Sequence, residues 1–198
     1  MAWEPDYCTD DELNHFIRSG DADINTDNEL EVALAITGAS RAIDLACNRQ
    51  FGQDEDPTVR LYKSLTLSPS VRRVKIDDVM VTEGLTVVTN DVTGAAITYS
   101  LTPVNNLVKG KPYTELRLMN HCPTVPFEDV KVTASFGWST VPRAIQQACL
   151  LQASRFLARR EAPFGIAGSP EQGSEMRLLA RVDPDVAVLL TRYIRWWA

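Results

Sequence analysis

The sequence predicts an α+β protein in which a helical framework of about four helices carries an inserted antiparallel β-sheet or small barrel. The hydrophobic period is helical up to residue 52, changes to two over residues 57–138, and is helical again over residues 139–198. Asn, Asp and Gly residues interrupt the middle region, as expected between short antiparallel strands. We therefore expect residues 1–52 and 139–198 to pack as one helical domain, with residues 57–138 as an inserted β domain.

The first helix is predicted from a capping box. Thr9 precedes Glu12 by three residues, a spacing at which each side chain can bond the other residue's backbone N–H. Leu13, Phe16 and Ile17 then recur at helical spacing, so we expect them to face inward. The helix should end near Gly20.

The second helix should run from a second capping box, Thr26 to Glu29, to about Asn48. It carries two apolar stripes on nearly opposite sides, whereas a surface helix needs only one. We therefore expect it to be sandwiched, either within the fold or between copies of the chain. One stripe comprises Val32, Ile36, Ala39, Ile43 and Cys47, and the other comprises Leu30, Leu34 and Leu45.

Six short segments alternate between apolar and polar residues and read as strands. They are residues 59–62, 71–76, 85–89, 97–101, 114–118 and 130–134.

Two further helices are predicted in the last third of the chain. Pro142 suits the first turn of a helix that continues to about Arg160, because its missing N–H would have no helical acceptor. Residues 161–182 contain several Pro and Gly residues and read as a long loop. Asp183 and Pro184 should start the last helix, whose apolar stripe is Val186, Leu189, Leu190, Tyr193, Ile194 and Trp197.

Composition excludes some classes of protein. Asp and Glu number 26 against 20 Lys and Arg, giving a net charge of −6, which weighs against tight binding to duplex DNA. No apolar run is long enough to span a membrane, and the acidic N-terminus does not resemble a secretory signal. Cys47 and Cys149 fall on apolar helix faces, where free cysteine acts as a small hydrophobe, so we expect a reduced chain.

No catalytic, cofactor or metal site is expected. Asp21, Asp23 and Asn25 resemble the start of a calcium loop, but Thr26 and Val32 occupy the positions of the required Gly and Glu. His121 and Cys122 could form a reactive pair, although filling of a loop is the more common role. The four cysteines lack zinc-site spacing.

Two groups of residues are candidates for contacts with other molecules, and each also has an explanation within the fold. Arg155, Arg159 and Arg160 cluster at the end of the third helix, where they complement the helix dipole or meet an acidic or phosphate-bearing partner. Trp196 and Trp197 lie at the chain end, and Trp is a leading anchor residue at interfaces. Trp197 could equally pack on the chain's own helices.

The order of several motifs resembles the head-to-tail connector (adaptor) proteins of long-tailed bacteriophages, with the actinobacteriophage branch as the nearest match. These motifs are Phe136-Gly137-Trp138-x-x-Val141-Pro142, Ala162-Pro163-Phe164-Gly165 and Arg181-x-Asp183-Pro184-Asp185-Val186. Asp77-Asp78-Val79, Gly84-Leu85-Thr86-Val87, Gly110-x-Pro112-Tyr113-Thr114 and Tyr7-Cys8-Thr9-Asp10 are similar to segments of that branch.

This resemblance implies a structural virion protein at the head–tail junction, assembled in the host cytoplasm. It implies a ring, typically of twelve copies, beneath the portal, through which double-stranded DNA passes without specific binding. The partners would be the portal, sister copies and the next neck, head-closure or tail-terminator protein. Candidates for portal docking are Tyr193, Arg195, Trp196 and Trp197, and candidates for ring contacts are Val32, Ile36, Ile43, Leu151, Arg155 and Arg159.

Other functions remain open at the level of sequence. The chain could be a different neck or tail-completion protein that uses the β domain as its main interface. It could be a non-enzymatic module that binds a carbohydrate or peptide on the sheet, or a hydrolase with an unrecognised site.

Overall fold

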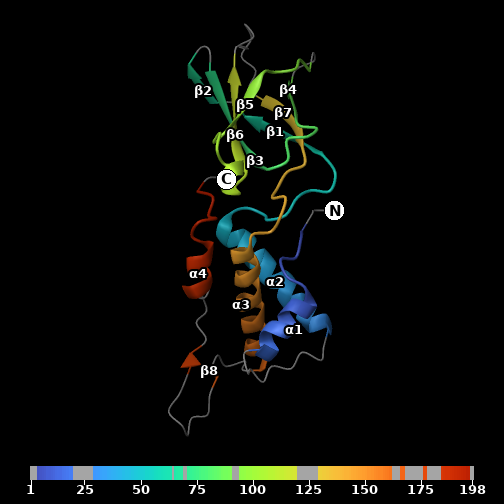
Figure 1. The fold of residues 1–198 in the computed structure, drawn as a ribbon, viewed down its shortest axis with the longest axis vertical. Helices are drawn as coiled ribbons and strands as arrows, with labels where there is room; N and C mark the ends of the chain where they lie inside the picture. The colour runs from blue at the N-terminus through green and yellow to red at the C-terminus, as the bar shows by residue number, and fades with distance from the viewer. Residues whose placement is uncertain are drawn as a thin grey trace. The chain divides into compact units, whose positions relative to one another are not determined.

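The computed structural model divides the chain into two compact units, each with its own core. The helical unit comprises residues 1–51 and 141–198, and the β unit comprises residues 52–140 (Figure 1). The structure describes residues 4–19, 29–63, 65–68, 71–90, 94–119, 129–161, 166–167, 176–177 and 184–196. The α+β class predicted from the sequence is confirmed.

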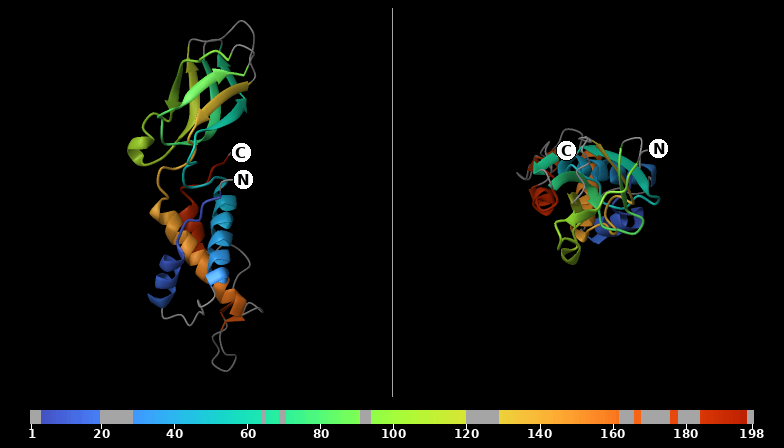
Figure 2. Two further views of the ribbon diagram at one scale, coloured as in Figure 1. Left: turned by 90° about the vertical axis from the view of Figure 1, so that its right-hand side faces the viewer. Right: turned by 90° about the horizontal axis from the view of Figure 1, so that it is seen from above.

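The helical unit contains α1 (Asp10–Ser19), α2 (Glu29–Cys47), α3 (Arg143–Glu161) and α4 (Pro184–Leu190). Helix α3 packs against each of the other three helices. Helices α2 and α3 lie side by side in both Figure 1 and the turned view of Figure 2. The core between the helices contains Leu13, Ile17, Ile145, Cys149 and Ala153, as their helical spacing predicted.

The capping box of α1 is confirmed atom by atom. The Thr9 N–H donates to Glu12 Oε2 at 2.9 Å, and the Glu12 N–H donates to Thr9 Oγ1 at 3.3 Å. Two N–H groups that no helical carbonyl can accept are thus satisfied. The second predicted capping box starts at Thr26 and lies outside the described residues, except for Glu29.

The last helix is shorter than its apolar stripe predicted. It ends at Leu190, and residues 191–193 form a turn in which the Tyr193 N–H donates to Leu190 O. The Arg195 N–H then donates to the carbonyl of Cys47, at the C-terminal end of α2, over 2.8 Å. This bond satisfies a carbonyl that α2 itself leaves open, and it draws the chain out of helical geometry.

The β unit consists of two antiparallel sheets around one core. Their strand orders are β1-β7-β4 and β2-β3-β6-β5. The strands are β1 (Thr58–Lys63), β2 (Leu65–Ser68), β3 (Val71–Val79), β4 (Thr86–Thr89), β5 (Tyr99–Thr102), β6 (Tyr113–Met119) and β7 (Asp129–Ala134). Six of them match the predicted segments; β2 is the one that the sequence analysis missed. The core of this unit includes Val74, Leu116, Val132 and Phe136.

The two ends of the β unit are held together by backbone hydrogen bonds. The Asp54 N–H donates to Phe136 O at 2.9 Å, and the Trp138 N–H donates to Gly52 O at 2.7 Å. Gly137 lies between them with φ +114°, and a Cβ there would come within 1.9 Å of Gly52 O. Only glycine fits this position, which explains the Gly of the Phe-Gly-Trp sequence.

The predicted loop over residues 161–182 lies largely outside the described residues. Within it the structure describes β8 (Ile166–Ala167) and β9 (Met176–Arg177), which pair antiparallel. Glu161 belongs to the end of α3.

Candidate assembly surface

Helix α2 presents one apolar stripe to the core and the other to solvent. Leu30, Leu34 and Leu45 are 69%, 63% and 86% exposed, respectively. The prediction of two stripes on opposite sides is therefore confirmed, and this unit covers only one of them. Exposed leucines that share one helix face are typical of a surface that another molecule covers.

Three of the residues expected to form ring contacts lie in the core instead. Val32, Ile36 and Ile43 are buried among the helices of their own unit. Helical periodicity placed them correctly on one face, but it could not show that the other helices of this unit cover that face. The opposite stripe, which carries Leu30 and Leu34, is the accessible one.

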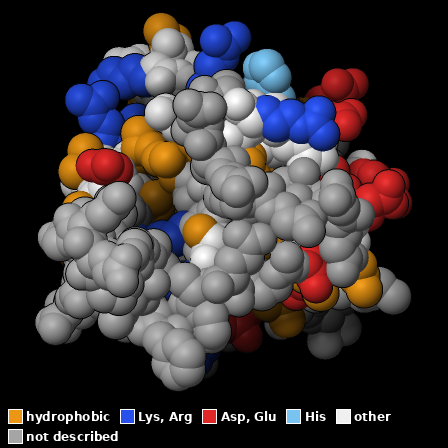
Figure 3. All heavy atoms as spheres, turned by 90° about the horizontal axis from the view of Figure 1, so that it is seen from below, with side chains coloured by type: hydrophobic (Ala, Val, Ile, Leu, Met, Phe, Trp, Pro, Cys, Tyr) orange, Lys and Arg blue, Asp and Glu red, His pale blue; other side chains and the backbone are white. Residues whose placement is uncertain are grey.

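The exposed stripe borders a hollow between α2 and α3. The hollow has a volume of about 270 Å³ and is lined by Glu31, Leu34, Ala35, Phe156 and Leu157. A Cβ on Gly38 would lie 3.6 Å from the Phe156 ring, an ordinary van der Waals distance, so α2 and α3 are in contact beside the hollow. Figure 3, which views the molecule from below, shows hydrophobic side chains next to Lys and Arg side chains.

The remaining ring-contact candidates lie on α3 and are half-buried. They are Leu151, Arg155 and Arg159. They are spaced by four residues and therefore share one side of α3, and their half-burial leaves part of each side chain accessible there.

The C-terminal candidates differ in accessibility. The Tyr193 ring packs edge-to-face on Phe51 with ring centroids 5.6 Å apart, so it already stabilises the helical unit. Arg195 is half-buried, and its backbone is tied to Cys47. Trp196 is 84% exposed, which leaves its indole accessible to a partner. Trp197 lies outside the described residues.

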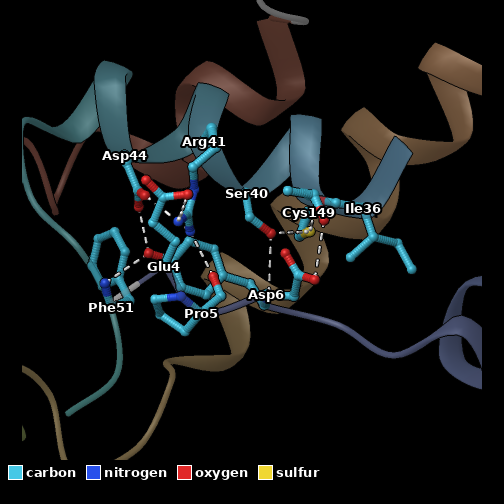
Figure 4. A network of polar contacts seen from close by, with 11 residues as sticks. Glu4, Pro5, Asp6, Ile36, Ser40, Arg41, Asp44, Phe51 and Cys149 are labelled. Carbon is cyan, nitrogen blue, oxygen red and sulfur yellow. Dashed lines mark hydrogen bonds and ion pairs between the residues drawn. The ribbon is translucent and has the colours of Figure 1, made fainter. Parts of the chain in front are cut away.

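A polar network fixes the N-terminal segment against α2 (Figure 4). Ser40, Arg41 and Asp44 of α2 point toward this segment. Arg41 Nη2 donates to Pro5 O at 2.6 Å, and the Tyr7 N–H donates to Ser40 Oγ at 3.1 Å. The Tyr7 hydroxyl donates to Asp44 Oδ1 and accepts from the Phe51 N–H at 2.8 Å.

Burial governs the ionisation of this network. It raises the pKa of Asp44 to about 6, against the hydrogen bond from Tyr7 and the charge of Arg41, which both lower it. Burial likewise raises the pKa of the Tyr7 hydroxyl well above its ordinary value, and the neighbouring Asp44 carboxylate adds to the effect. The phenol therefore stays protonated and keeps its hydrogen bond to Asp44.

The β unit has exposed apolar residues that the sequence analysis did not single out. Val59 and Leu61 face solvent on β1, which is an edge strand of its sheet. Val104 and Val108 are exposed in the turn between β5 and β6, where Val108 reaches 90%. Alternation along residues 59–62 could have indicated the β1 pair, because Arg60 and Tyr62 occupy the opposite face.

The residues considered for chemistry contribute no cluster within the described part of the chain. There, no group of three or more His, Cys, Asp or Glu residues is placed to hold a metal ion. None of the helices in that part is both long and apolar enough to cross a membrane. Asp21, Asp23, Asn25, His121 and Cys122 lie outside the described residues.

Comparison with known proteins gives a likeness in fold. No protein-family model matches the chain, and no curated protein matches its sequence. The structure is similar to a chain in the neck of an empty gene transfer agent (GTA) particle, computed with C6 symmetry. The TM-score is 0.54 at 16% sequence identity, over 100% of this chain and 95% of that chain.

A second similar chain comes from the neck of a native GTA particle computed with C12 symmetry. It covers 100% of this chain and 94% of its own length, with 15% identity and a TM-score of 0.49. The likeness to the first of these chains, at 16% identity, establishes a shared fold. The helical framework and the β unit thus occur together in a chain from the neck of a phage-like particle.

Proposed function

We propose that the chain is a structural subunit of the neck of a tailed, phage-like particle. In this role it is a head-to-tail connector that forms a ring beneath the portal, extends the DNA channel and joins the head to the neck or tail. The particle is assembled in the host cytoplasm, and the mature protein resides in the virion. The protein acts without catalysis and without a cofactor.

The observation that carries this proposal is the exposed apolar stripe of α2 in a fold shared with a neck protein. Leu30 and Leu34 together with the neighbouring hollow form an apolar patch on one side of the helical unit. When one patch meets a different patch on the next copy, the copies close into a ring if the rotation permits. The symmetry of the similar GTA neck supports this arrangement, and the resemblance in sequence motifs suggests twelve copies.

The net charge of −6 suits a channel subunit. Acidic side chains that line a channel repel the phosphates of DNA, so duplex can pass without binding. The resemblance to the actinobacteriophage branch rests on the order of sequence motifs and remains a prediction.

Light scattering of the purified chain, with and without the portal, tests the proposal. A connector subunit should form a ring, alone or on the portal, and deletion of residues 196–198, which keeps buried Val186 and Leu190 in place, should abolish attachment to the portal. A chain that stays monomeric and ignores the portal, yet binds a carbohydrate or peptide, would support the binding-module alternative. Turnover of ester, glycoside or phosphate substrates would support a hydrolase.

A second candidate role has its own observation. Exposed Val59 and Leu61 on an edge strand favour the β unit as an interface, because such strands can pair with another chain. The protein would then be another neck or tail-completion component that docks through this sheet. Replacing Leu61 by Lys should abolish particle assembly in that case and leave ring formation through α2 unchanged.

A further inference from the structure

Two cysteines far apart in the sequence meet inside the helical unit. Cys8 precedes α1, and Cys149 lies in the middle of α3, 141 positions later. Their Sγ atoms are 3.3 Å apart, both residues are buried, and both are free thiols. A disulfide bond is about 2.05 Å long, so the two sulfur atoms need to approach by little more than about 1 Å.

The environment of the pair is polar on one side. Ser40 Oγ lies 3.5 Å from Cys149 Sγ and also accepts a hydrogen bond from the Tyr7 N–H (Figure 4). The hydrogen bond from Cys8 lowers the pKa of Cys149, and the same bond raises the pKa of Cys8. Cys149 is thus the thiol that more readily becomes a thiolate, the nucleophilic form of cysteine.

We propose that Cys8 and Cys149 form a reversible disulfide when the reduced chain meets a peroxide. The Cys149 sulfur attacks one peroxide oxygen, the O–O bond breaks, and the other oxygen leaves as water after taking a proton. Cys149 is then a sulfenic acid. The Cys8 sulfur attacks the Cys149 sulfur, the S–O bond breaks, and the hydroxide leaves as a second water with the Cys8 proton. The two thiols lose two electrons in total, and the peroxide gains them.

Oxidation would fasten the N-terminal segment to α3 by a covalent bond. That segment is otherwise held by hydrogen bonds such as Arg41 to Pro5 O and Thr37 Oγ1 to Asp6 Oδ2. The new bond closes a loop that contains α1, α2 and the whole β unit, so it restricts the unfolded chain strongly. The oxidised protein should therefore unfold at a higher temperature than the reduced one.

Cys47 serves as an internal comparison. It is as deeply buried as Cys149, and its burial raises its pKa to about 12, which keeps it a thiol. A thiol that stays protonated reacts slowly, whereas the bond from Cys8 lowers the pKa of the equally buried Cys149. A reducing cytosol would keep Cys8 and Cys149 as thiols, and an oxidising exterior would convert them to the disulfide. This inference concerns the helical unit alone and does not depend on the proposed function.

The test uses the full-length protein, reduced, exposed to hydrogen peroxide, treated with iodoacetamide and digested without reductant. Mass spectrometry of the digest should find a peptide pair joined through Cys8 and Cys149. Before alkylation, the intact oxidised protein should be lighter than the reduced protein by two hydrogens. The melting temperature should rise and return to its original value with dithiothreitol.

Three variants sharpen the test. Cys47→Ser should keep the rise in melting temperature, whereas Cys8→Ser and Cys149→Ser should lose it. If Cys149→Ser fails to fold, the peptide map of the wild type and the Cys8→Ser melt decide. Separate alkylated Cys8 and Cys149 peptides after oxidation, or a link to Cys47 or Cys122 instead, would overturn the proposal.

Discussion

The indole N–H of Trp138 donates a hydrogen bond to Oδ2 of Asp78 over 2.9 Å, joining residues 60 positions apart inside the β unit. Both residues are buried. Each belongs to a short sequence that suggested the family resemblance, Phe136-Gly137-Trp138 in one case and Asp77-Asp78-Val79 in the other. The bond gives both sequences a physical role in holding the last segment of the β unit to strand β3.

Replacing Trp138 by Phe should destabilise the protein by about 1–3 kcal/mol, because a buried carboxylate loses one of its donors. Urea unfolding followed by circular dichroism measures the change. Trp196→Phe is the matched control, since Trp196 is 84% exposed and its replacement should leave the free energy of unfolding unchanged. Equal stabilities of the two variants would contradict the role assigned to the bond.

Gly137→Ala should destabilise the protein by several kcal/mol. Its Cβ would lie 1.9 Å from Gly52 O, and its φ of +114° is unfavourable for any other residue. Gly84→Ala is the control, because Gly84 also has a positive φ of +73° but nothing lies within 4 Å of the added Cβ. The control should cost only about 1 kcal/mol. Thermal unfolding of both variants, followed by circular dichroism, provides the comparison.

Asp44 should make stability depend on pH between about 4 and 6. Its pKa is raised from 3.8 to about 6 in the folded state, so folding favours the protonated carboxyl. The stabilisation is complete below pH 3.8 and is lost as the pH rises through 6, because the unfolded chain then binds fewer protons than the folded one.

Asp44→Asn keeps an acceptor for the Tyr7 hydroxyl and cannot ionise. Relative to the wild type, this variant should gain up to roughly 3 kcal/mol of unfolding free energy between pH 4 and pH 7. Urea titrations of both proteins at several pH values test this. The charged neighbours Arg41 and Glu4 remain in both proteins, so their own titration largely cancels. A difference that stays constant with pH would rule out the raised pKa.

Leu34→Asp should prevent assembly without unfolding the subunit. Leu34 is 63% exposed and borders the hollow beside Phe156, so its replacement costs the isolated chain little but would place a charge in an apolar contact. Leu34→Met, which stays apolar, should assemble normally. Sedimentation or light scattering in the presence of the portal distinguishes the two. If Leu34→Asp formed normal rings, the exposed stripe of α2 would not be part of the interface between copies.

Trp196→Ala should weaken attachment to the portal by at least about 2 kcal/mol, the loss typical of an anchor residue. The melting temperature should not change, because the side chain is exposed in the subunit. Tyr193→Ala makes the contrast, since loss of its edge-to-face contact with Phe51 should lower the melting temperature. Binding of each variant to immobilised portal measures the effect.

Local patterns predicted most of the elements, because each depends on residues close in sequence. The Thr9–Glu12 capping box and the alternation along six strands are of this kind. Strand β2 (Leu65–Ser68) was missed, since four residues show too little alternation and the strand forms by pairing with β3. The C-terminal end of α4 could not be predicted either, because it depends on a hydrogen bond between Arg195 and Cys47, which are distant in sequence.

For the candidate surface, too, the sequence predicted what depends on neighbouring residues and missed what depends on tertiary packing. Periodicity placed Val32 and Ile36 on one side of α2 and Leu30 and Leu34 on the other, and both placements hold. Which side remains exposed depends on how α1 and α3 pack on α2, and no pattern within α2 records that packing. The sequence analysis thus chose ring-contact candidates on a face of α2 that is buried in this unit, and a role of α2 as an interface element stays a prediction.

Backbone hydrogen bonds pair residues 52–54 with residues 136–138, so the first and last segments of the β unit lie next to each other. Adjacent chain ends make residues 52–140 a unit that can be exchanged as a whole. Evolution or an experimenter can enlarge, trim or graft it across a short linker while the order of the helices stays the same. One helical frame could thereby carry different β units, with sequence change concentrated in the exchangeable part.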